Sequence, residues 1–97
     1  MAYKVGQKKA VQPFNLVVFG GNGDLAFRKI YPALYNRFVN ENLNEEFTIY
    51  VIDRIYLDIE VFFEKLKKTL LKSTLETFDE VHYKLFFINF KLFFTPD

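Results

Sequence analysis

The sequence contains no cysteine and no tryptophan, and its 97 residues include a single histidine. The absence of cysteine excludes disulfides, thiolate catalysis and cysteine-ligated metals, and it fits a reducing compartment such as the cytosol. Long apolar runs are absent as well. The most apolar stretch, residues 85–94, carries Asn89 and Lys91 and is too short for a membrane-spanning helix. Residues 1–14 lack the apolar region of a secretory signal. We therefore expect a cytoplasmic protein with no membrane contact.

The sequence also lacks an excess of one charge. Thirteen lysines and arginines accompany twelve aspartates and glutamates, and the formal net charge is only +1. Because the basic residues are scattered among acidic ones, we expect no nucleic-acid partner. Hydrophobic residues make up 51% of the chain and charged residues 26%, as is typical of a globular protein. We expect an N-terminal extension over residues 1–13 and one partial domain over residues 14–97.

Three apolar runs are predicted to form strands. Residues 14–19 end at a glycine pair, residues 47–52 end at Asp53, and residues 83–94 form the last run. In that last run every second residue is apolar, which places these residues on one face of the strand. Its predicted members are Phe86, Ile88, Phe90, Leu92 and Phe94.

Two segments between these runs have helical spacing. In the first, which starts at Gly23, Pro32 should kink or split the helix near Tyr31, because proline lacks an N–H and clashes with the preceding turn. The second should be capped by Asp58. The first helix is predicted to bury Ala26, Ile30, Ala33, Leu34 and Phe38, and the second Ile59, Phe62, Phe63, Leu66 and Leu70. The order predicts an α/β fold, the βαβαβ half of a Rossmann-like, doubly wound parallel sheet.

Three of the four glycines lie between the first strand and the first helix. A dinucleotide pyrophosphate needs backbone amides from a helix N-terminus and a turn without bulky side chains, and glycines supply both. Gly21, Gly23 and Ala26 fit the spacing G-x-G-x-x-A, and Gly20 with the last two fits G-x-x-G-x-x-A. The alternative is a tight turn in which glycine serves only a positive φ.

Residues 19–34, Phe-Gly-Gly-Asn-Gly-Asp-Leu-Ala-Phe-Arg-Lys-Ile-Tyr-Pro-Ala-Leu, resemble the glucose-6-phosphate dehydrogenase signature. In that signature G-x-x-G-D-L-A precedes a basic pair, then Tyr-Pro and Ala-Leu. The similarity continues more weakly through residues 47–63 and fades beyond Leu70. The resemblance implies the N-terminal coenzyme-binding part of an enzyme of the oxidative pentose phosphate pathway. That enzyme oxidises glucose 6-phosphate to 6-phosphogluconolactone and reduces NADP.

The resemblance also implies roles for individual residues. Lys29, which precedes x-x-Pro, would contact the substrate phosphate, although by its chemistry alone it could be a solvated charge. Arg54 would bind the 2′-phosphate of NADP, a task that suits a guanidinium. The coenzyme pyrophosphate would be held by the turn residues Gly20, Gly21, Asn22, Gly23, Asp24 and Leu25.

Asp53 complicates the choice of coenzyme. A carboxylate at the end of this strand usually binds the ribose hydroxyls of NAD and repels a 2′-phosphate, and the family more often has a small residue there. The use of NADP, of NAD or of both therefore stays open. Asp53 and Arg54 could also simply pair with each other at the strand end.

The catalytic part of the family pattern is missing from these residues. The family's general base is a histidine in a later motif, Arg-Ile-Asp-His-Tyr-Leu-Gly-Lys, and the surroundings of His82 do not match it. We predict no catalytic residue here and no metal site, since no histidines occur at metal-ligand spacing. We also expect these residues to contain no part of the β+α domain that, in the family, binds the sugar phosphate and forms the homo-oligomer interface.

Two functions remain in competition. The chain could be part of a glucose-6-phosphate dehydrogenase that is inactive by itself. It could instead be a stand-alone or degenerate dinucleotide-binding module that binds a coenzyme, or a partner through an unpaired strand edge, without catalysis. A different oxidoreductase family would share the glycine turn but would not explain the Arg28-Lys29-x-x-Pro32 continuation. The expected ligands are NADP and, in the full-length family, glucose 6-phosphate.

Overall fold

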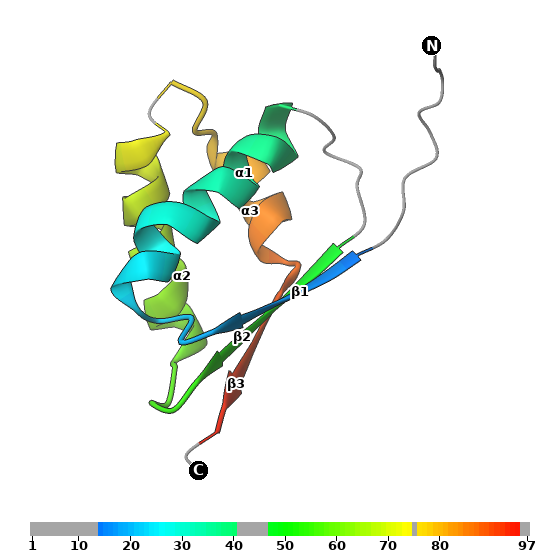
Figure 1. The fold of residues 1–97 in the computed structure, drawn as a ribbon. Coiled ribbons are helices and arrows are strands. Elements are labelled where there is room, and N and C mark those ends of the chain that lie inside the picture. The colour runs from blue at the N-terminus through cyan, green and yellow to red at the C-terminus, as the bar shows by residue number, and fades with distance from the viewer. Residues whose placement is uncertain (1–13, 41–46, 75, 96–97) are drawn as a thin grey trace.

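The structure is a computed structural model, and it describes residues 14–40, 47–74 and 76–95. The expected N-terminal extension, residues 1–13, lies outside the described residues. Figure 1 shows the strands and helices coloured along the chain. In chain order the elements are β1 (Phe14–Phe19), the π-helix η2 (Ala26–Ile30), α1 (Tyr31–Asn40), β2 (Phe47–Asp53), α2 (Ile59–Ser73), α3 (Glu80–Phe87) and β3 (Phe90–Phe94).

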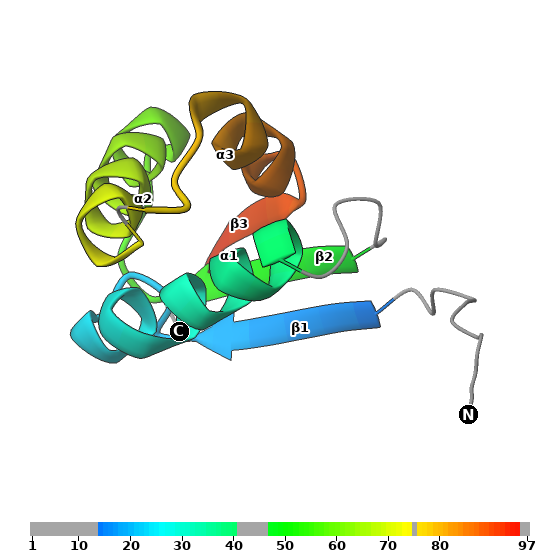
Figure 2. The ribbon, with the colours of Figure 1, turned by 90° about the horizontal axis from the view of Figure 1, so that it is seen from above.

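The three strands form one parallel sheet in the order β1-β2-β3. Along the first pair, Phe14 lies opposite Phe47 and Phe19 lies opposite Ile52. All the helices lie on the same side of the sheet, as the view from above shows (Figure 2). Because successive parallel strands are linked by helical connections, the predicted α/β class and Rossmann-like half-sheet are confirmed.

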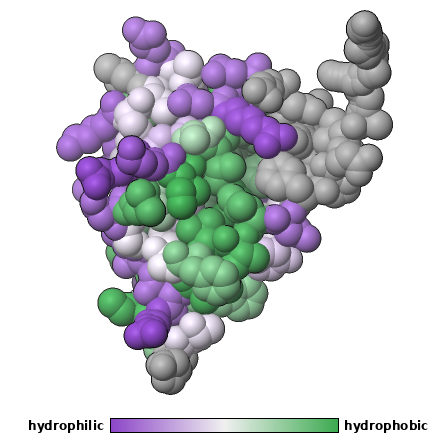
Figure 3. All heavy atoms as spheres, in the orientation of Figure 1, coloured by the Kyte–Doolittle hydropathy of each residue, from purple (hydrophilic) through white to green (hydrophobic). Residues whose placement is uncertain are grey.

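The two faces of the sheet differ in burial because side chains alternate along each strand. On the helix-covered face Val18, Ile49, Val51 and Phe90 are buried. On the opposite face Val17, Phe19 and Phe93 are 45%, 78% and 47% exposed. Hydrophobic side chains gather in the centre and lower part of Figure 3, whereas polar ones surround the helices.

The first helix changes from a π-helix to an α-helix at Tyr31, where the sequence predicted a kink or a split caused by Pro32. The helix starts at Asp24, runs as a π-helix from Ala26 to Ile30 and continues without a gap as α1 from Tyr31. The Tyr31 N–H donates to the Ala26 carbonyl, five residues back. The predicted kink or split near Tyr31 is therefore a switch from π- to α-helical hydrogen bonding, which precedes Pro32 because proline has no N–H to donate.

The buried face of this helix differs from the prediction. Ala33 is exposed, and Ile30 and Leu34 are only partly buried. The prediction was wrong at Ala33, whereas Ile30 and Leu34 do pack against the core. It omitted Tyr31 and Tyr35, whose hydroxyls find hydrogen-bond partners inside the fold. The buried hydrophobic residues of η2 and α1 are Ala26, Phe27, Tyr31, Tyr35 and Phe38.

The second helix, α2, follows the prediction at its N-terminus. The Asp58 carboxylate accepts the N–H groups of Glu60 and Val61 at 2.9 and 3.1 Å, which satisfies two amides of the first turn. The predicted core residues Phe62, Leu66 and Leu70 are buried, and Phe63 is partly buried. The prediction was wrong at Ile59, which is exposed as the first residue of α2, about one turn before the first buried residue, Phe62.

The last strand is shorter than predicted. Residues 83–94 were expected to be extended throughout, but residues 80–87 form the helix α3 and only Phe90–Phe94 form β3. Asp79 caps α3 by accepting the His82 N–H at 3.0 Å. Tyr83 and Phe86 are buried at helical spacing. The many aromatic residues of this segment are typical of a strand, but the Asp79 cap and the packing of the Tyr83 and Phe86 rings stabilise a helix.

Aromatic rings fill the space between the sheet and the helices. Phe62 of α2 contacts the rings of Phe27, Tyr31 and Phe90 at centroid distances of 5.4–6.1 Å. Most of these contacts are edge-on or tilted, which are the favoured arrangements of aromatic pairs. Within the described residues, none of the helices has both the length and the apolar character required to cross a bilayer.

Candidate functional site

The glycine turn and the end of β2 lie side by side at one edge of the sheet. The register that pairs Phe19 with Ile52 places the residues that follow both strands next to each other. The N–H groups of Gly20 and Gly21 donate to the Ile52 carbonyl at 2.8 and 3.3 Å. In open parallel sheets ligands bind at this edge, beyond the carboxyl ends of the strands.

The turn requires glycine at its first two positions for different reasons. Gly20 has a φ of +67°, a conformation that residues with a side chain rarely adopt. Gly21 is buried, and a Cβ atom at this position would overlap Val51 Cγ1 and would lie 2.8 Å from the Tyr31 hydroxyl. The turn therefore needs a bare backbone both for its conformation and for its close approach to β2.

The first helix begins directly after the turn. The Gly23 N–H donates to the Gly20 carbonyl at 2.9 Å, and the Gly23 carbonyl accepts the Phe27 N–H at 3.3 Å. Gly23 is thus the N-cap, and the next three amides, those of Asp24, Leu25 and Ala26, have no acceptor within the helix. Their N–H groups and the positive end of the helix dipole suit an anion such as a phosphate.

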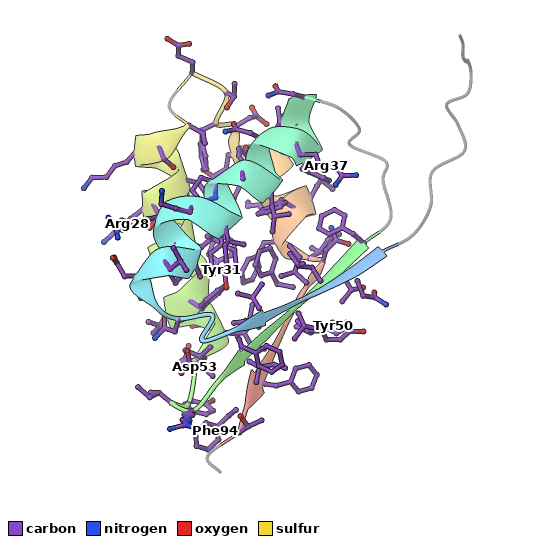
Figure 4. All side chains as sticks on the ribbon, viewed as in Figure 1. Arg28, Tyr31, Arg37, Tyr50, Asp53 and Phe94 are labelled. Atoms are coloured by element: carbon purple, nitrogen blue, oxygen red, sulfur yellow. The ribbon has the colours of Figure 1, made fainter. Side chains whose placement is uncertain are left out.

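Tyr31 supports the turn from within the core. Its hydroxyl donates to the Gly21 carbonyl at 2.8 Å, while its ring is fully buried. Burial raises the pKa of Tyr31 far above its usual range, and the nearby charge of Asp53 raises it further, so the hydroxyl stays protonated and remains a donor. Tyr31 and Asp53 approach the turn from the helix and from the end of β2 (Figure 4).

Asp53 binds backbone amides on both sides of its strand end. Its Oδ2 accepts the Asn22 N–H at 2.9 Å, and its Oδ1 accepts the Ile55 N–H at 3.2 Å. The Asn22 hydrogen bond is the main cause that lowers the pKa of Asp53 below its usual value. No ion pair between Asp53 and Arg54 is found among the described residues, so the predicted alternative of a simple charge pair finds no support here.

The two predicted basic site residues are both exposed. Arg54 follows β2 in a bend, and Lys29 lies in the π-helical turn. In the described part of the chain neither side chain has a hydrogen-bond or ion-pair partner, so both could reach a ligand. Asp24, a predicted turn residue, instead pairs with Arg28 one helical turn later, at 2.8 Å. The coenzyme and substrate roles of all these residues stay predictions.

One basic residue at the turn, Lys65, was not predicted from the sequence. Lys65 of α2 donates from Nζ to Asn22 Oδ1 at 2.9 Å and to the Asn22 carbonyl at 3.2 Å. The same ammonium lies 4.2 Å from the centroid of the Phe27 ring. Lys65 is 43 positions away from Asn22 in the sequence, and nothing in its local sequence could have revealed the contact.

His82 lies at another place in the fold. It belongs to the first turn of α3, and its Nδ1 is 3.7 Å from the Asp79 carboxylate that caps that helix. Asp79 in turn contacts the Tyr35 hydroxyl, one helical turn beyond the tyrosine that supports the glycine turn. The structure therefore gives His82 a place beside a helix cap, away from the glycine turn.

A parallel βαβαβ sheet, with a glycine turn before its first helix, defines a Rossmann-type dinucleotide-binding domain. A family model described as "Glucose-6-phosphate dehydrogenase, NAD binding domain" matches residues 17–95. The chain belongs to this family, and the resemblance noted in the sequence is confirmed. A nicotinamide dinucleotide is accordingly the class of coenzyme that such a domain binds.

Individual relatives agree with this assignment. Glucose-6-phosphate 1-dehydrogenase of Aggregatibacter actinomycetemcomitans is 41% identical over 58 residues, 60% of this chain. The Treponema pallidum enzyme is 36% identical over 74 residues, 76% of this chain. A solved glucose-6-phosphate dehydrogenase in complex with glucose 6-phosphate superposes with a TM-score of 0.71 at 25% identity and covers 95% of this chain. The matched regions span only 12%, 14% and 19% of these three proteins.

Proposed function

We propose that this chain is the coenzyme-binding part of an enzyme that oxidises glucose 6-phosphate to 6-phosphogluconolactone with NADP. The observation that carries the proposal is the N-terminal end of the first helix, where the amides of residues 24–26 face the glycine turn. Arg54 lies at the same edge of the sheet. The relatives with this reaction in their names support the choice of substrate.

The turn fits a pyrophosphate in shape and in charge. Gly20 and Gly21 place no side chain in the turn, because Gly20 has a positive φ and Gly21 has no room for a Cβ atom. The Asn22 N–H is already bonded to Asp53, so the amides left for phosphate oxygens are those of residues 24–26. Bound NADP would supply the hydride acceptor, and these residues would hold and orient its diphosphate.

Arg54 is the residue that we assign to the 2′-phosphate of NADP. It is exposed and directly follows the strand whose end adjoins the turn. A guanidinium can donate two parallel hydrogen bonds to a phosphate and stack on a base. Lys29, exposed on the π-helical turn, is assigned to the substrate phosphate, as in the family signature.

We further propose that the 97-residue chain binds a coenzyme without oxidising the sugar. Oxidation at C1 needs a group that accepts the hydroxyl proton, commonly a histidine. The only histidine of the chain, His82, lies beside the cap of α3. A cytoplasmic location stays a prediction from the amino-acid composition, and a homo-oligomeric full-length enzyme stays a prediction that rests on the family.

The test is a titration of the purified chain with NADP and with NAD, followed by glucose 6-phosphate. We expect NADP to bind and no NADPH to form. Formation of NADPH would contradict the proposal that this chain binds a coenzyme without oxidising the sugar. A lack of binding to either coenzyme would contradict the proposed function.

Arg54→Ala tests the phosphate assignment. Loss of a charge-assisted hydrogen-bond pair should weaken NADP binding by about tenfold to a hundredfold and should leave NAD binding nearly unchanged. Lys72→Ala, which removes an exposed positive charge from the last turn of α2, is the matched control and should change neither affinity. Equal losses for both coenzymes in Arg54→Ala would count against a 2′-phosphate contact.

A further inference from the structure

Asn22, at the centre of the glycine turn, is held from two sides by charged residues that are distant in sequence. The Asp53 carboxylate at the end of β2 accepts its N–H at 2.9 Å. The Lys65 ammonium from α2 donates to its side-chain and backbone oxygens at 2.9 and 3.2 Å. We call these three residues the Asn22 clamp. The clamp ties the turn to the sheet and to the second helix at once.

The Asp53 carboxylate is hydrogen-bonded to the backbone on both sides of its strand end. Both oxygens accept backbone N–H groups, one from Asn22 and one from Ile55. An acidic residue that reads the ribose hydroxyls of a dinucleotide would have to turn its oxygens towards the ligand. Here such a rotation would break charge-assisted hydrogen bonds to the backbone, which are stronger than neutral ones.

Lys65 alters the electrostatic effect of Asp53 on a bound phosphate. Its ammonium is positioned by two oxygens of Asn22 and by the face of the Phe27 ring. It lies near enough to contribute to the lowered pKa of Asp53, after the larger effect of the Asn22 N–H. A positive charge next to the carboxylate reduces its repulsion of an anion at Arg54.

We propose that Asp53 and Lys65 are positioning residues that fix the pyrophosphate turn, and that Asp53 does not select NAD by binding its ribose. This inference rests on the proposed function, because it concerns the same coenzyme site. From the sequence, Asp53 left the choice between NADP and NAD open. The acidic residue holds the turn, and discrimination between NADP and NAD is left to Arg54.

The first experiment compares Asp53→Asn with the unsubstituted chain. The clamp predicts that affinities for NADP and NAD fall by the same factor, about fivefold to tenfold, since the charge-assisted hydrogen bond that orders the turn is replaced by a weaker, neutral one. Glu60→Gln, which removes an exposed negative charge from the first turn of α2, is the control and should leave both affinities unchanged. Loss of NAD affinity alone, together with a gain for NADP, would overturn the proposal.

The second experiment replaces the other charged residue of the Asn22 clamp, in the variant Lys65→Met, and leaves Asp53 intact. Methionine keeps an apolar chain over the Phe27 ring but cannot donate to Asn22. We expect the affinities for both coenzymes to fall, by a factor of roughly five for NAD and by more for NADP, because the Asp53 charge then repels the 2′-phosphate without compensation. A fall for only one coenzyme, or no change in either affinity, would overturn the role of Lys65.

A measurement without coenzyme separates this inference from the proposed function. Amide hydrogen exchange at Asn22 should be roughly tenfold faster in Asp53→Asn than in the unsubstituted chain, because its acceptor is weakened. Unchanged exchange at Asn22 would overturn the clamp even if both coenzymes bind. If the unsubstituted chain binds neither coenzyme, the proposed function and the selectivity argument fall, whereas the exchange rate still decides whether the clamp exists.

Discussion

The helix-covered face of the sheet and the edge that carries the glycine turn are stabilised in different ways. Behind the sheet, buried rings such as Phe62 pack against several other rings. At the turn, single hydrogen bonds from Tyr31, Asp53 and Lys65 hold a backbone that has few side chains of its own. Burial of a large ring contributes several times the free energy of one hydrogen bond. The fold and the site should therefore be separable by mutation.

The largest expected effect is on the aromatic layer. Phe62→Ala should lower the free energy of unfolding by about 3–5 kcal/mol, because it leaves a cavity among four neighbouring rings. Phe19→Ala, on the open face, is the matched control and should change it by less than about 0.5 kcal/mol. Urea denaturation followed by circular dichroism measures both. Similar losses for the two variants would mean that the open face is as well packed as the covered one.

The next effect is at Gly21, where the core meets the turn. Gly21→Ala introduces a Cβ atom that overlaps Val51, and the resulting shift should cost about 1–3 kcal/mol of stability. The shift should also weaken coenzyme binding. Gly20→Ala meets no neighbouring atom but keeps a positive φ, and should cost about 1 kcal/mol. Urea denaturation and coenzyme titration test both variants, and an equal or larger loss at Gly20 would contradict the role of close approach.

Two buried tyrosines, one helical turn apart, allow a finer comparison. Tyr31 donates to the glycine turn, whereas the Tyr35 hydroxyl accepts the Asp79 N–H at 3.2 Å near α3. Each tyrosine-to-phenylalanine change should cost about 1 kcal/mol through a lost hydrogen bond. Only Tyr31→Phe should weaken coenzyme binding, as measured by titration. If Tyr35→Phe weakens binding as much, support of the turn is not specific to Tyr31.

The smallest expected effect concerns pH. Hydrogen bonding to the Asn22 N–H lowers the pKa of Asp53 in the folded state, so its contribution to stability is present above the unfolded pKa of about 4 and is lost as pH falls through the lower folded value. Between pH 5 and 2, unfolding free energy should therefore fall less steeply in Asp53→Asn than in the unsubstituted chain. The measurement is urea denaturation over a pH series. Glu60→Gln should retain the steeper fall. An identical fall of the unfolding free energy with pH in all three proteins would refute the contribution of Asp53 to stability.

Sequence patterns predicted the parts of the fold that depend on neighbours along the chain. The strand before Gly20, the capping of α2 by Asp58 and the strand that ends at Asp53 all depend on short-range preferences, and all were found. The glycine turn was predicted for the same reason, since its conformation depends on the absence of side chains within a few residues.

The prediction failed where packing outweighs local preference. Residues 80–87 have strand-like aromatic residues but form a helix, because Tyr83 and Phe86 meet the core at helical spacing and Asp79 caps the first turn. The first helix turns Tyr31 and Tyr35 inward, where their hydroxyls find hydrogen-bond partners 10 and 44 positions away in the sequence. Such partners cannot be recognised in a local window.

By itself, the sequence determined the first two strands, the two helices that follow them, the bare turn after β1 and membership of a coenzyme-binding family. Only the tertiary structure decided what surrounds that turn. It brought Asp53 and Lys65, 31 and 43 positions away in the sequence, to Asn22, where Asp53 accepts the backbone N–H and Lys65 donates to the side-chain and backbone oxygens. The physical reason is that a turn's conformation is a local property of its backbone, whereas its hydrogen-bond partners depend on how strands pair and how helices pack.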